Sequence, residues 1–347
     1  MSGLRAAYGR PLAAVLLLLV ALWVLGMILL PQAIIVERSL WWTERSADAA
    51  AASLRLDALH NETMVKELDL ADAAPAARAA LAAELEAMRA EIARLEAIET
   101  APVKVWGLAN YTRMSGLHGH VFVRTIVSAG LVTLLALVVC YPVAWAVAQR
   151  AAPGRAALLM LGLVVPYAIN ELLRIYAWLM ILDYQGVING LLAWAGIVSF
   201  EARTWIPFLD GPGAVFVAMV YAYVLFMAFP LVGAMQTLDR NQIEAARDLG
   251  AGAAMIHRRI VIPHSRPGIA VGCIMVFMLS VGSFSVPHIM TRGVGGEWFS
   301  QLIYRQFFEA SSWNIGAAYA FSLMLVCLLV VAAVMRLFKV GIREIAR

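Results

Sequence analysis

The sequence predicts an all-α integral membrane protein, a bundle of six transmembrane helices with a helical hairpin between the first and second helices. The first observation is composition: 62% of the 347 residues are hydrophobic and only 14% are charged, which is far more apolar than an average soluble domain. The second is a set of apolar runs that exceed the roughly 20 residues needed to cross a bilayer as a helix. The third is a long polar insertion, rich in Ala, Glu, Arg and Leu, after the first run.

The apolar runs give the expected membrane spans. They cover residues 11–36, 119–149, 156–182, 213–238, 267–290 and 313–338. The first run is longer than the apolar core of a secretory signal, which has about 7–15 residues, so we expect it to be retained. After the third run, glycines interrupt an apolar stretch too short to span, and we expect a short helix there that lies on the outer membrane surface or dips into it. Spans two to six and their loops, residues 119–347, then form one core.

The arginines and lysines favour one orientation of this bundle. With the N-terminus in the cytoplasm, thirteen of them lie at or inside the inner boundary: Arg5, Arg10, Arg150, Arg155, Arg240, Arg247, Arg258, Arg259, Arg266, Arg336, Lys339, Arg343 and Arg347. The two short outer loops hold only Arg203, Arg292 and Arg305. This asymmetry is typical of positively charged cytoplasmic loops. It predicts that both termini are cytoplasmic and that residues 37–118 lie outside.

The outer insertion, residues 37–118, has the pattern of a helical hairpin. Apolar residues recur four and three positions apart, as in a short heptad seam, at Leu81, Leu85, Met88, Ile92 and Leu95. A weaker helical pattern in the first half comprises Leu54, Ala58, Met64 and Leu68. Pro75 should separate the two helices, because proline lacks an N–H donor and clashes with the preceding turn. The hairpin is either a spacer that packs on the bundle or a docking element for an external partner.

Several classes of function are excluded by what the sequence lacks. It has no G-x-x-x-x-G-K-[ST] phosphate-binding loop and no convincing Ser/His/Asp or Cys/His arrangement. The cysteines Cys140, Cys273 and Cys327 all fall inside apolar runs, and the histidines show no metal-ligand spacing. We therefore expect a non-catalytic chain that binds no metal and no cofactor and has no nucleic-acid partner.

A charged stretch, EAARDLGAGAAMIHRRIVIP (244–263), separates the fourth and fifth spans. Asp239 is expected to cap a helix, with Gln242 three residues later as in a capping box. Gly250 and Gly252 should then stop this helix, because glycine tolerates a left-handed backbone. A second short apolar pattern follows. Pro263 and Pro267 then favour a fresh helix start for span five. On this pattern alone the stretch is either an amphipathic connector or a segment that a partner protein grips.

The order Glu244-Ala245-Ala246, three residues, Gly250, nine residues, Ile260, one residue and Ile262-Pro263 resembles the EAA loop of type I ABC importer permeases. Ile262 stands where that family usually has leucine. The resemblance implies that the 239–266 loop forms the coupling helix that inserts into a cleft of a separate ATPase subunit. The residues expected to carry this coupling are Glu244, Ala245, Ala246, Asp248, Gly250, Ile260 and Pro263.

Three further stretches resemble the spermidine/putrescine permease branch of that family: LLRIYAWLMILDYQGVINGLL (172–192), VYAYVLFMAFPL (220–231) and SVGSFSVPHIM (280–290). The likeness covers roughly residues 119–340 and does not extend to the outer hairpin. It implies a multi-pass protein of the bacterial inner membrane. The implied partners are an ATPase dimer that uses ATP and Mg, a second permease chain that we expect to be a different one, an external solute-binding protein and membrane lipid.

The same resemblance implies a small polar cargo, either a polyamine such as spermidine or putrescine or a related amine or amino-acid-like solute. Polyamine permeases of that branch carry acidic residues near the positions of Ser283 and His288. A carboxylate there would suit a polycation, and serine and histidine remove its charge. The sequence therefore leaves the identity of the cargo open.

Polar and aromatic groups inside the spans are the candidates for the solute path. Ionisable residues at membrane depth are costly and usually pair or face a water-filled path. Glu171 and Arg174, three apart in one span, either pair with each other or line the path, and Pro166 could kink the chain just before them. The full set expected on the path is Glu171, Arg174, Tyr221, Tyr223, Ser283, Phe284, Ser285 and His288.

For each of these groups packing is the alternative. The small residues around Phe284 could serve close helix packing or form a bendable segment in which Phe284 is a gate. His288 at a span end is also typical of an interfacial position. Tyr221, Tyr223 and Phe226 could belong to an aromatic belt.

Two other classes of membrane protein share parts of this pattern. A membrane sensor could use the outer hairpin as its input module, but no cytoplasmic signalling domain follows the last span. A secondary transporter driven by an ion gradient often shows repeated halves, and none is evident here. An ATP-driven importer subunit is the interpretation that we carry forward.

Overall fold

The computed structural model describes residues 2–44, 47–72, 75–100, 103–112, 114–150, 152–291 and 297–341. These residues are almost entirely helical, with one two-stranded sheet among them. Six helical stretches in the described part of the chain are long and apolar enough to cross a membrane: Pro11–Ser39, Gly116–Arg150, Glu171–Trp194, Gly213–Gln236, Ala253–Gly282 and Trp313–Phe338. This confirms the predicted all-α class and the number of spans.

The chain divides into two compact units. The first contains the described residues before Met114 together with Trp313–Ala318, and the second contains the rest. The division into three parts expected from the sequence, with boundaries at 36/37 and 118/119, stays a prediction.

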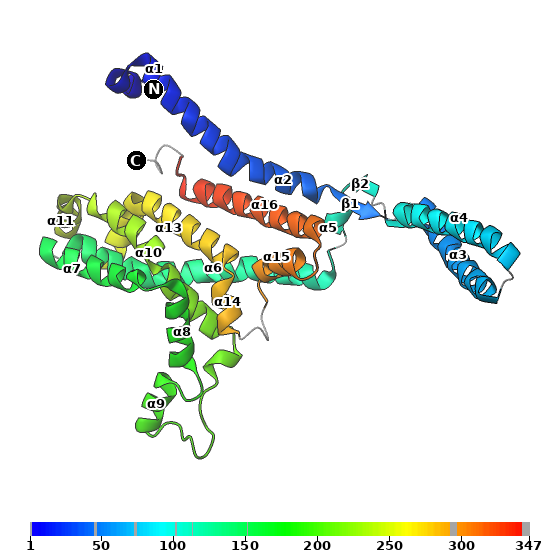
Figure 1. The fold of residues 1–347 in the computed structure, drawn as a ribbon. Helices are drawn as coiled ribbons and strands as arrows, with labels where there is room; N and C mark the ends of the chain where they lie inside the picture. Colours follow the sequence, from blue (N-terminus) through cyan, green and yellow to red (C-terminus); the bar gives the residue numbers. More distant parts are fainter. Residues whose placement is uncertain are drawn as a thin grey trace. The chain divides into compact units, whose positions relative to one another are not determined.

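The first unit begins with one long apolar helical stretch and carries the hairpin (Figure 1). Its elements are α1 (Ser2–Val24), a π-helical turn (Leu25–Leu29), α2 (Leu30–Ser39), β1 (Trp41–Glu44), α3 (Ala47–Asp72), α4 (Pro75–Thr100), β2 (Val103–Trp106) and α5 (Ala109–Thr112). Pro75 is the first residue of α4, a position where its missing N–H costs nothing. The helix break predicted at Pro75 is therefore confirmed.

Helices α3 and α4 lie side by side as the predicted antiparallel pair. Leu85 and Ile92 of the predicted seam are buried. Ile92 forms a cluster with Leu56 and Leu59 of α3, and Met88 and Leu95 pack against this cluster. The helix predicted in the first half of the hairpin is present as α3, but the residues of its predicted pattern are not its buried face. Its buried apolar positions are Ala52, Leu56 and Leu59, whereas Leu54, Met64 and Leu68 are exposed. The error arose because α3 carries apolar residues on two opposite faces, and only one of them meets α4.

A short antiparallel ribbon closes the base of the hairpin. Strand β1 pairs with β2, with Trp41 opposite Trp106. The buried Asn110 side chain donates to the backbone carbonyls of Ser39 (3.0 Å) and Trp41 (2.8 Å). The Tyr111 hydroxyl donates to the Ser39 hydroxyl at 2.6 Å. Because a buried polar group is stabilising only when its bonds are made, these contacts fix where the hairpin leaves and rejoins the first unit.

The second unit holds the remaining helices. Its elements are α6 (Gly116–Trp145), a π-helical turn (Ala146–Arg150), α7 (Pro153–Val164), a 3₁₀ turn (Val165–Ala168), α8 (Glu171–Leu182), α9 (Val187–Trp194), a 3₁₀ turn (Phe208–Asp210), α10 (Gly213–Gln236), α11 (Arg240–Asp248), α12 (Ala253–Ile256), a π-helical turn (His257–Val261), α13 (Ile262–Gly282), α14 (Ser285–Met290), α15 (Phe299–Phe308) and α16 (Trp313–Phe338). The first six residues of α16 belong to the first unit.

Helices α6, α10 and α13 form the core of the second unit. Met219 and Met227 of α10 and Val276 of α13 are fully buried there. The closest approach is between α10 and α13. A Cβ atom on Gly268 would lie 2.4 Å from the Pro230 carbonyl oxygen, and one on Gly272 would lie 2.7 Å from the Met227 sulfur. Small residues four apart allow two membrane helices to pack this closely.

The third predicted span, 156–182, is not one helix. The chain is helical over α7 and its 3₁₀ turn, leaves the helix at Ile169 and Asn170, and starts again as α8. Pro166 lies in the 3₁₀ turn, so the predicted kink is a complete break. The predicted short helix after this span is α9, and the membrane face on which it lies stays a prediction. In Figure 1, α8 and α9 project away from the α6–α10–α13 core.

Both boundaries predicted for the fifth span, 267–290, are wrong. The helix starts earlier, at Ala253, and runs without interruption into α13. It ends at Gly282, and a non-helical Ser283 separates it from α14. The π-helical turn precedes Pro263, so the proline follows a widened turn and does not force a new helix start. Small residues around Ser283 end the helix where the apolar pattern alone continues.

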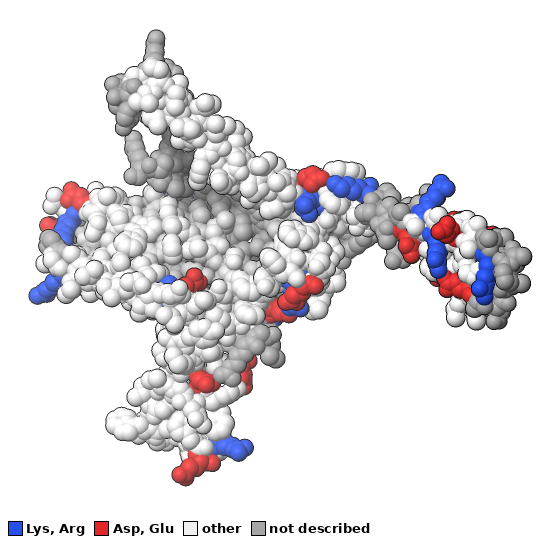
Figure 2. Space-filling model, in the orientation of Figure 1, with Lys and Arg blue, Asp and Glu red and all other residues white. Residues whose placement is uncertain are grey.

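Charged side chains are scarce over the long helices of the visible face and gather over the hairpin and around the helix ends (Figure 2). In the hairpin, Lys66 pairs with Glu84, and Arg89 pairs with Glu67 at 2.6 Å. Exposed pairs of this kind contribute only about 0–1 kcal/mol. The apolar α3–α4 seam therefore contributes more to holding the hairpin together than these pairs do.

Substituting Gly268 by alanine should destabilise the second unit, because the added methyl would overlap the Pro230 carbonyl and the Ala234 side chain. Overpacking of this kind costs about 1–3 kcal/mol. The midpoint of unfolding of the purified chain in detergent measures the effect. Gly130→Ala is the matched control, since a Cβ there meets nothing within 4 Å. Equal midpoints for the two variants would contradict the close contact.

Candidate functional site

The predicted coupling loop folds as a capped helix, α11. The Asp239 carboxylate accepts a hydrogen bond from the Asn241 N–H at 3.0 Å, which confirms the predicted N-cap. At the other end, Gly250 has φ +79°. The Gly250 N–H donates to the Arg247 carbonyl at 2.8 Å and the Ala251 N–H to the Ala246 carbonyl at 2.9 Å. These two bonds form the Schellman motif that ends many helices, so the predicted stop at Gly250 is confirmed.

One side of α11 is anchored and the other is uncovered. Ile243 is buried. Glu244, Ala245 and Asp248 are exposed, and Ala246 is half-buried. Leu249, at the end of the helix, is 88% exposed. This large apolar side chain therefore stands uncovered beside charged residues in the described part of the chain.

Leu249 is an exposed residue at the end of α11 that the predicted coupling set does not include. The spacing of Ile243, Ala246 and Leu249 suggests three residues on one buried face. The structure shows that the Schellman turn carries Leu249 away from that face. The signal that could have found it is its position directly before the left-handed Gly250.

Ile260 and Pro263 do not share this exposed surface. Ile260 lies in the π-helical turn and Pro263 in the first turn of α13, and both are half-buried. The structure therefore separates the predicted set into an exposed part on α11 and a part built into the root of the fifth span.

Hydrogen bonds tie the coupling segment to three helices. The Gln149 amide donates to the backbone carbonyls of Met235 (2.6 Å) and Leu238 (3.2 Å), at the end of α10. Thr237 and His264 are joined across the loop at 2.9 Å. Tyr141 of α6 bonds His257 of the π-helical turn at 2.8 Å. These bonds fix the two ends of the loop to α6, α10 and α13.

The solute-path candidates divide into two groups, and the first surrounds Tyr167. The Tyr167 hydroxyl donates to the Ala222 carbonyl at 2.8 Å, and it accepts from the Leu225 N–H at 3.4 Å. It thus enters the hydrogen-bond ladder of α10, a known cause of helix bending. The Arg174 guanidinium lies over the Tyr167 ring, 4.2 Å from its centre.

Arg174 and Glu171 do not form an ion pair with each other in the described part of the chain. Glu171 is exposed in the first turn of α8, and two buried nitrogens of Arg174 have no hydrogen-bond partner there. Tyr223 and Ser283 are both buried. Of the predicted path residues, the structure thus places Arg174 directly against Tyr167. Tyr221 packs edge-on against Trp178, with ring centres 5.4 Å apart. This contact fits the alternative in which Tyr221 serves helix packing.

The second group lines a cavity of about 540 Å³ beside the break between α13 and α14. The Phe284 ring is stacked on His288 at 5.1 Å and lies 4.9 Å from the Tyr304 ring. The Ser300 hydroxyl donates to the Ser283 carbonyl at 2.6 Å and holds the break open. The residues that line the cavity are Phe284, His288, Thr291, Glu297, Gln301, Tyr304, Arg305 and Glu309.

Two carboxylates in this cavity were missed from the sequence. Glu297 pairs with Arg305, and Glu309 is exposed at the end of α15. Both lie outside the predicted spans, in a stretch between two apolar runs that had no motif of its own. Ser285 begins α14 and is half-buried, and it does not line the cavity.

Three comparisons with known proteins bear on this arrangement. A family model described as "Binding-protein-dependent transport system inner membrane component" matches residues 126–343. The spermidine/putrescine transport system permease protein PotB of Escherichia coli (strain K12) is 36% identical over 64% of this chain and 79% of its own length. PotB of Haemophilus influenzae (strain ATCC 51907 / DSM 11121 / KW20 / Rd) is 30% identical over 69% of this chain and 82% of its own.

A solved structure shares the fold. One chain of a bacterial alginate ABC transporter, crystallised with an alginate pentasaccharide-bound periplasmic protein, superposes with a TM-score of 0.54 at 18% identity. The match covers 68% of this chain and 85% of that one.

Replacing Gly250 by valine should loosen the end of α11, because a branched residue at a left-handed position costs about 1–2 kcal/mol. The expected result is roughly tenfold faster hydrogen exchange at the amides of residues 250 and 251, measured by mass spectrometry on the full chain. Gly250→Asn should exchange nearly as the parent does, because asparagine tolerates this conformation. Unchanged exchange in the valine variant would contradict the described cap.

Proposed function

This chain belongs to the family of inner-membrane components of binding-protein-dependent transport systems, and from that premise we propose how it couples ATP use to solute uptake. It is a non-catalytic, multi-pass subunit of the inner membrane. We propose that both termini and α11 face the cytoplasm, as the arginine and lysine distribution favours. ATP and Mg are then bound by the partner ATPase, and this chain supplies the path and the lever.

The observation that carries the proposal is the exposed end of α11. Glu244, Asp248 and Leu249 form a surface, the coupling surface, that nothing in the described chain covers. An ATPase subunit that closes on ATP presses on it. The ties through Gln149, His257 and His264 then pass the movement to α6, α10 and α13.

The cargo that fits the cavity best is a small organic cation. Phe284 and Tyr304 offer aromatic faces, which attract ammonium groups, and Glu309 offers a carboxylate. The similar PotB proteins are named for spermidine and putrescine transport. Ser283 and His288 lack the negative charge expected there for a polycation. At the same cavity Glu297 is neutralised by its ion pair with Arg305, so Glu309 supplies the negative charge.

An external solute-binding protein would release its cargo into this cavity, and a second permease chain of different sequence would complete the path. Phe284 directly follows the break at Ser283 and lines the cavity. We propose that Phe284 is the gate between this cavity and the rest of the solute path. The outer hairpin has a rigid base and is available as a contact for the external protein.

Replacing Leu249 by aspartate or Glu244 by alanine should weaken the coupling surface. Loss of one well-packed interface residue typically costs about 1–2 kcal/mol, which is roughly a tenfold loss of affinity for the ATPase. Uptake and binding-protein-stimulated ATP hydrolysis by the reconstituted complex measure it. Leu54→Asp is the matched control, because Leu54 is an equally exposed leucine on the hairpin helix α3.

Normal coupling in the Leu249 and Glu244 variants at normal expression would sink this assignment. Uptake that survives removal of the ATPase partner would instead favour transport driven by an ion gradient.

Replacing Glu309 by glutamine should lower uptake of a radiolabelled polyamine by about fivefold, because a charge-assisted contact worth roughly 1 kcal/mol is lost. Stimulation of ATP hydrolysis should change little, since the coupling surface is intact. Glu201→Gln removes an exposed carboxylate outside the cavity and should leave uptake unchanged. Unchanged or faster uptake in the Glu309 variant would contradict a cationic cargo at this cavity.

A further inference from the structure

A second cavity, of about 720 Å³, lies where α6 and α10 end. None of the coupling or solute-path residues named above lines it. Its lining comes from the π-helical turn after α6, the first turns of α7 and the junction of α10 with α11: Val147, Ala148, Arg150, Ala152, Ala156, Ala157, Met160, Gln236 and Arg240. We call it the arginine pocket.

One wall of the arginine pocket is apolar and continues onto an open helix face. Ala156, Ala157 and Met160 of α7 form this wall. Further along α7, Leu158 and Leu161 are 68% and 57% exposed. Exposed leucines on a helix of a membrane bundle face either acyl chains or another apolar helix, so an apolar neighbour is expected along α7 beside the pocket.

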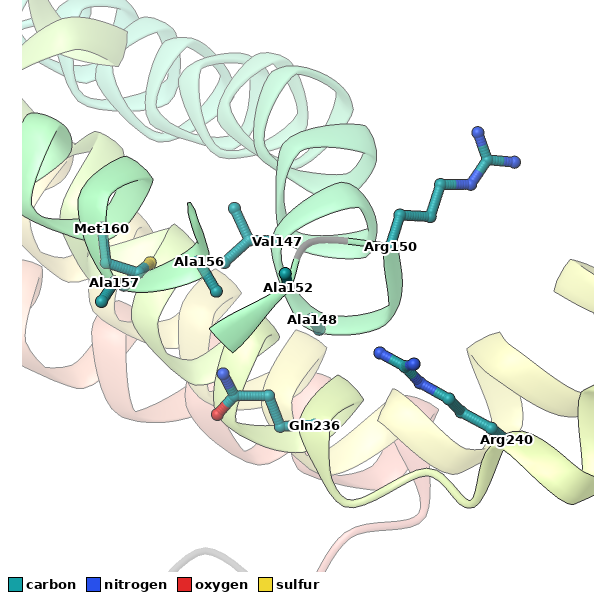
Figure 3. A pocket seen from close by; sticks show the side chains of 9 residues that line it. All are labelled: Val147, Ala148, Arg150, Ala152, Ala156, Ala157, Met160, Gln236 and Arg240. Atoms are coloured by element: carbon teal, nitrogen blue, oxygen red, sulfur yellow. The ribbon is translucent and has the colours of Figure 1, made fainter. Parts of the chain in front are cut away.

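The other side of the pocket is positively charged. In Figure 3 the Arg240 side chain reaches toward Ala148, and the Arg150 side chain projects outward from its backbone at the rim. In the described part of the chain, neither guanidinium forms an ion pair. Arginine is well suited to phosphate because its planar fork of N–H donors matches two phosphate oxygens.

The start of α7 adds to this charge. Ala152 is the N-cap, and its side chain cannot accept the hydrogen bonds of the first N–H groups. The N-terminus of a helix carries a partial positive charge that favours anions. Arg155 follows in the same first turn, and Gln236 contributes an amide on the opposite wall.

We propose that the arginine pocket binds the headgroup of an anionic phospholipid, a phosphodiester such as that of phosphatidylglycerol, with its acyl chains along α7. A pocket of basic residues between membrane helices, open to the bilayer, has the chemistry for such a headgroup. The bound lipid joins the end of α6 to Arg240, the first residue of α11. This inference does not depend on the cargo or on the ATPase.

The test is native mass spectrometry of the full chain in detergent, titrated with phosphatidylglycerol and with zwitterionic phosphatidylcholine. The expected result is preferential retention of phosphatidylglycerol. The double variant Arg150→Gln/Arg240→Gln should bind it about 30-fold more weakly, because each basic residue near an anionic headgroup contributes roughly a factor of five. Arg336→Gln/Lys339→Gln is the matched control, since it removes two exposed positive charges at the end of α16.

A second variant separates a pocket from general surface charge. Ala157→Trp fills the apolar wall at an exposed position and leaves both arginines in place. It should also lose phosphatidylglycerol, with an unchanged unfolding midpoint. The proposal is overturned if the control pair loses as much lipid as the arginine pair, or if the tryptophan variant retains it. It is also overturned if inorganic phosphate displaces the lipid at equal concentration, or if the arginine variant weakens only association with the ATPase.

Discussion

The close contact of α10 with α13 is the constraint on which the rest of the second unit depends. Gly268 and Gly272 let the two backbones approach until a single methyl group would overlap the opposite helix. In a bilayer, helices are held together by van der Waals packing of this kind more than by burial of apolar surface. The contact lies near the loop end of α13, so the loop joining the two helices leaves from a fixed pair of points. The coupling helix is for this reason mounted on a rigid base.

The far end of the same helix pair is built differently. Close packing gives way to a non-helical Ser283, a hydroxyl-bonded carbonyl and the stacked rings of Phe284 and His288. Across α10, the Tyr167 hydroxyl replaces part of the helix's own hydrogen bonding. One pair of helices thus has a stiff end, where the ATPase is proposed to push, and a pliable end, where the solute is proposed to pass. This contrast suits a lever, because movement imposed at the stiff end is taken up at the other.

Sequence reasoning identified the features that depend on local chemistry. The cap at Asp239, the stop at Gly250 and the start of α4 at Pro75 all follow from what single residues allow their own backbone to do. It failed where packing against other parts of the chain decides which residues are buried or where a helix starts. Leu54 and Leu56 are equally apolar, and only packing against α4 selects Leu56. Pro263 does not start a helix because the preceding π-helical turn makes room for it. Glu297 precedes α15 and Glu309 follows it, and the fold of this segment places both carboxylates at the cavity. No spacing in the sequence indicates that arrangement.

The ribbon at the base of the hairpin affects how freely the length of the hairpin can change. Strands β1 and β2 pair in register, so the insertion ends beside the point where it begins. A segment with adjoining ends can grow or shrink by whole helical turns without displacing the helices that flank it, since loop length adds little to the free energy of closing it. The hairpin can therefore change in length without altering how the helices of the permease pack against one another.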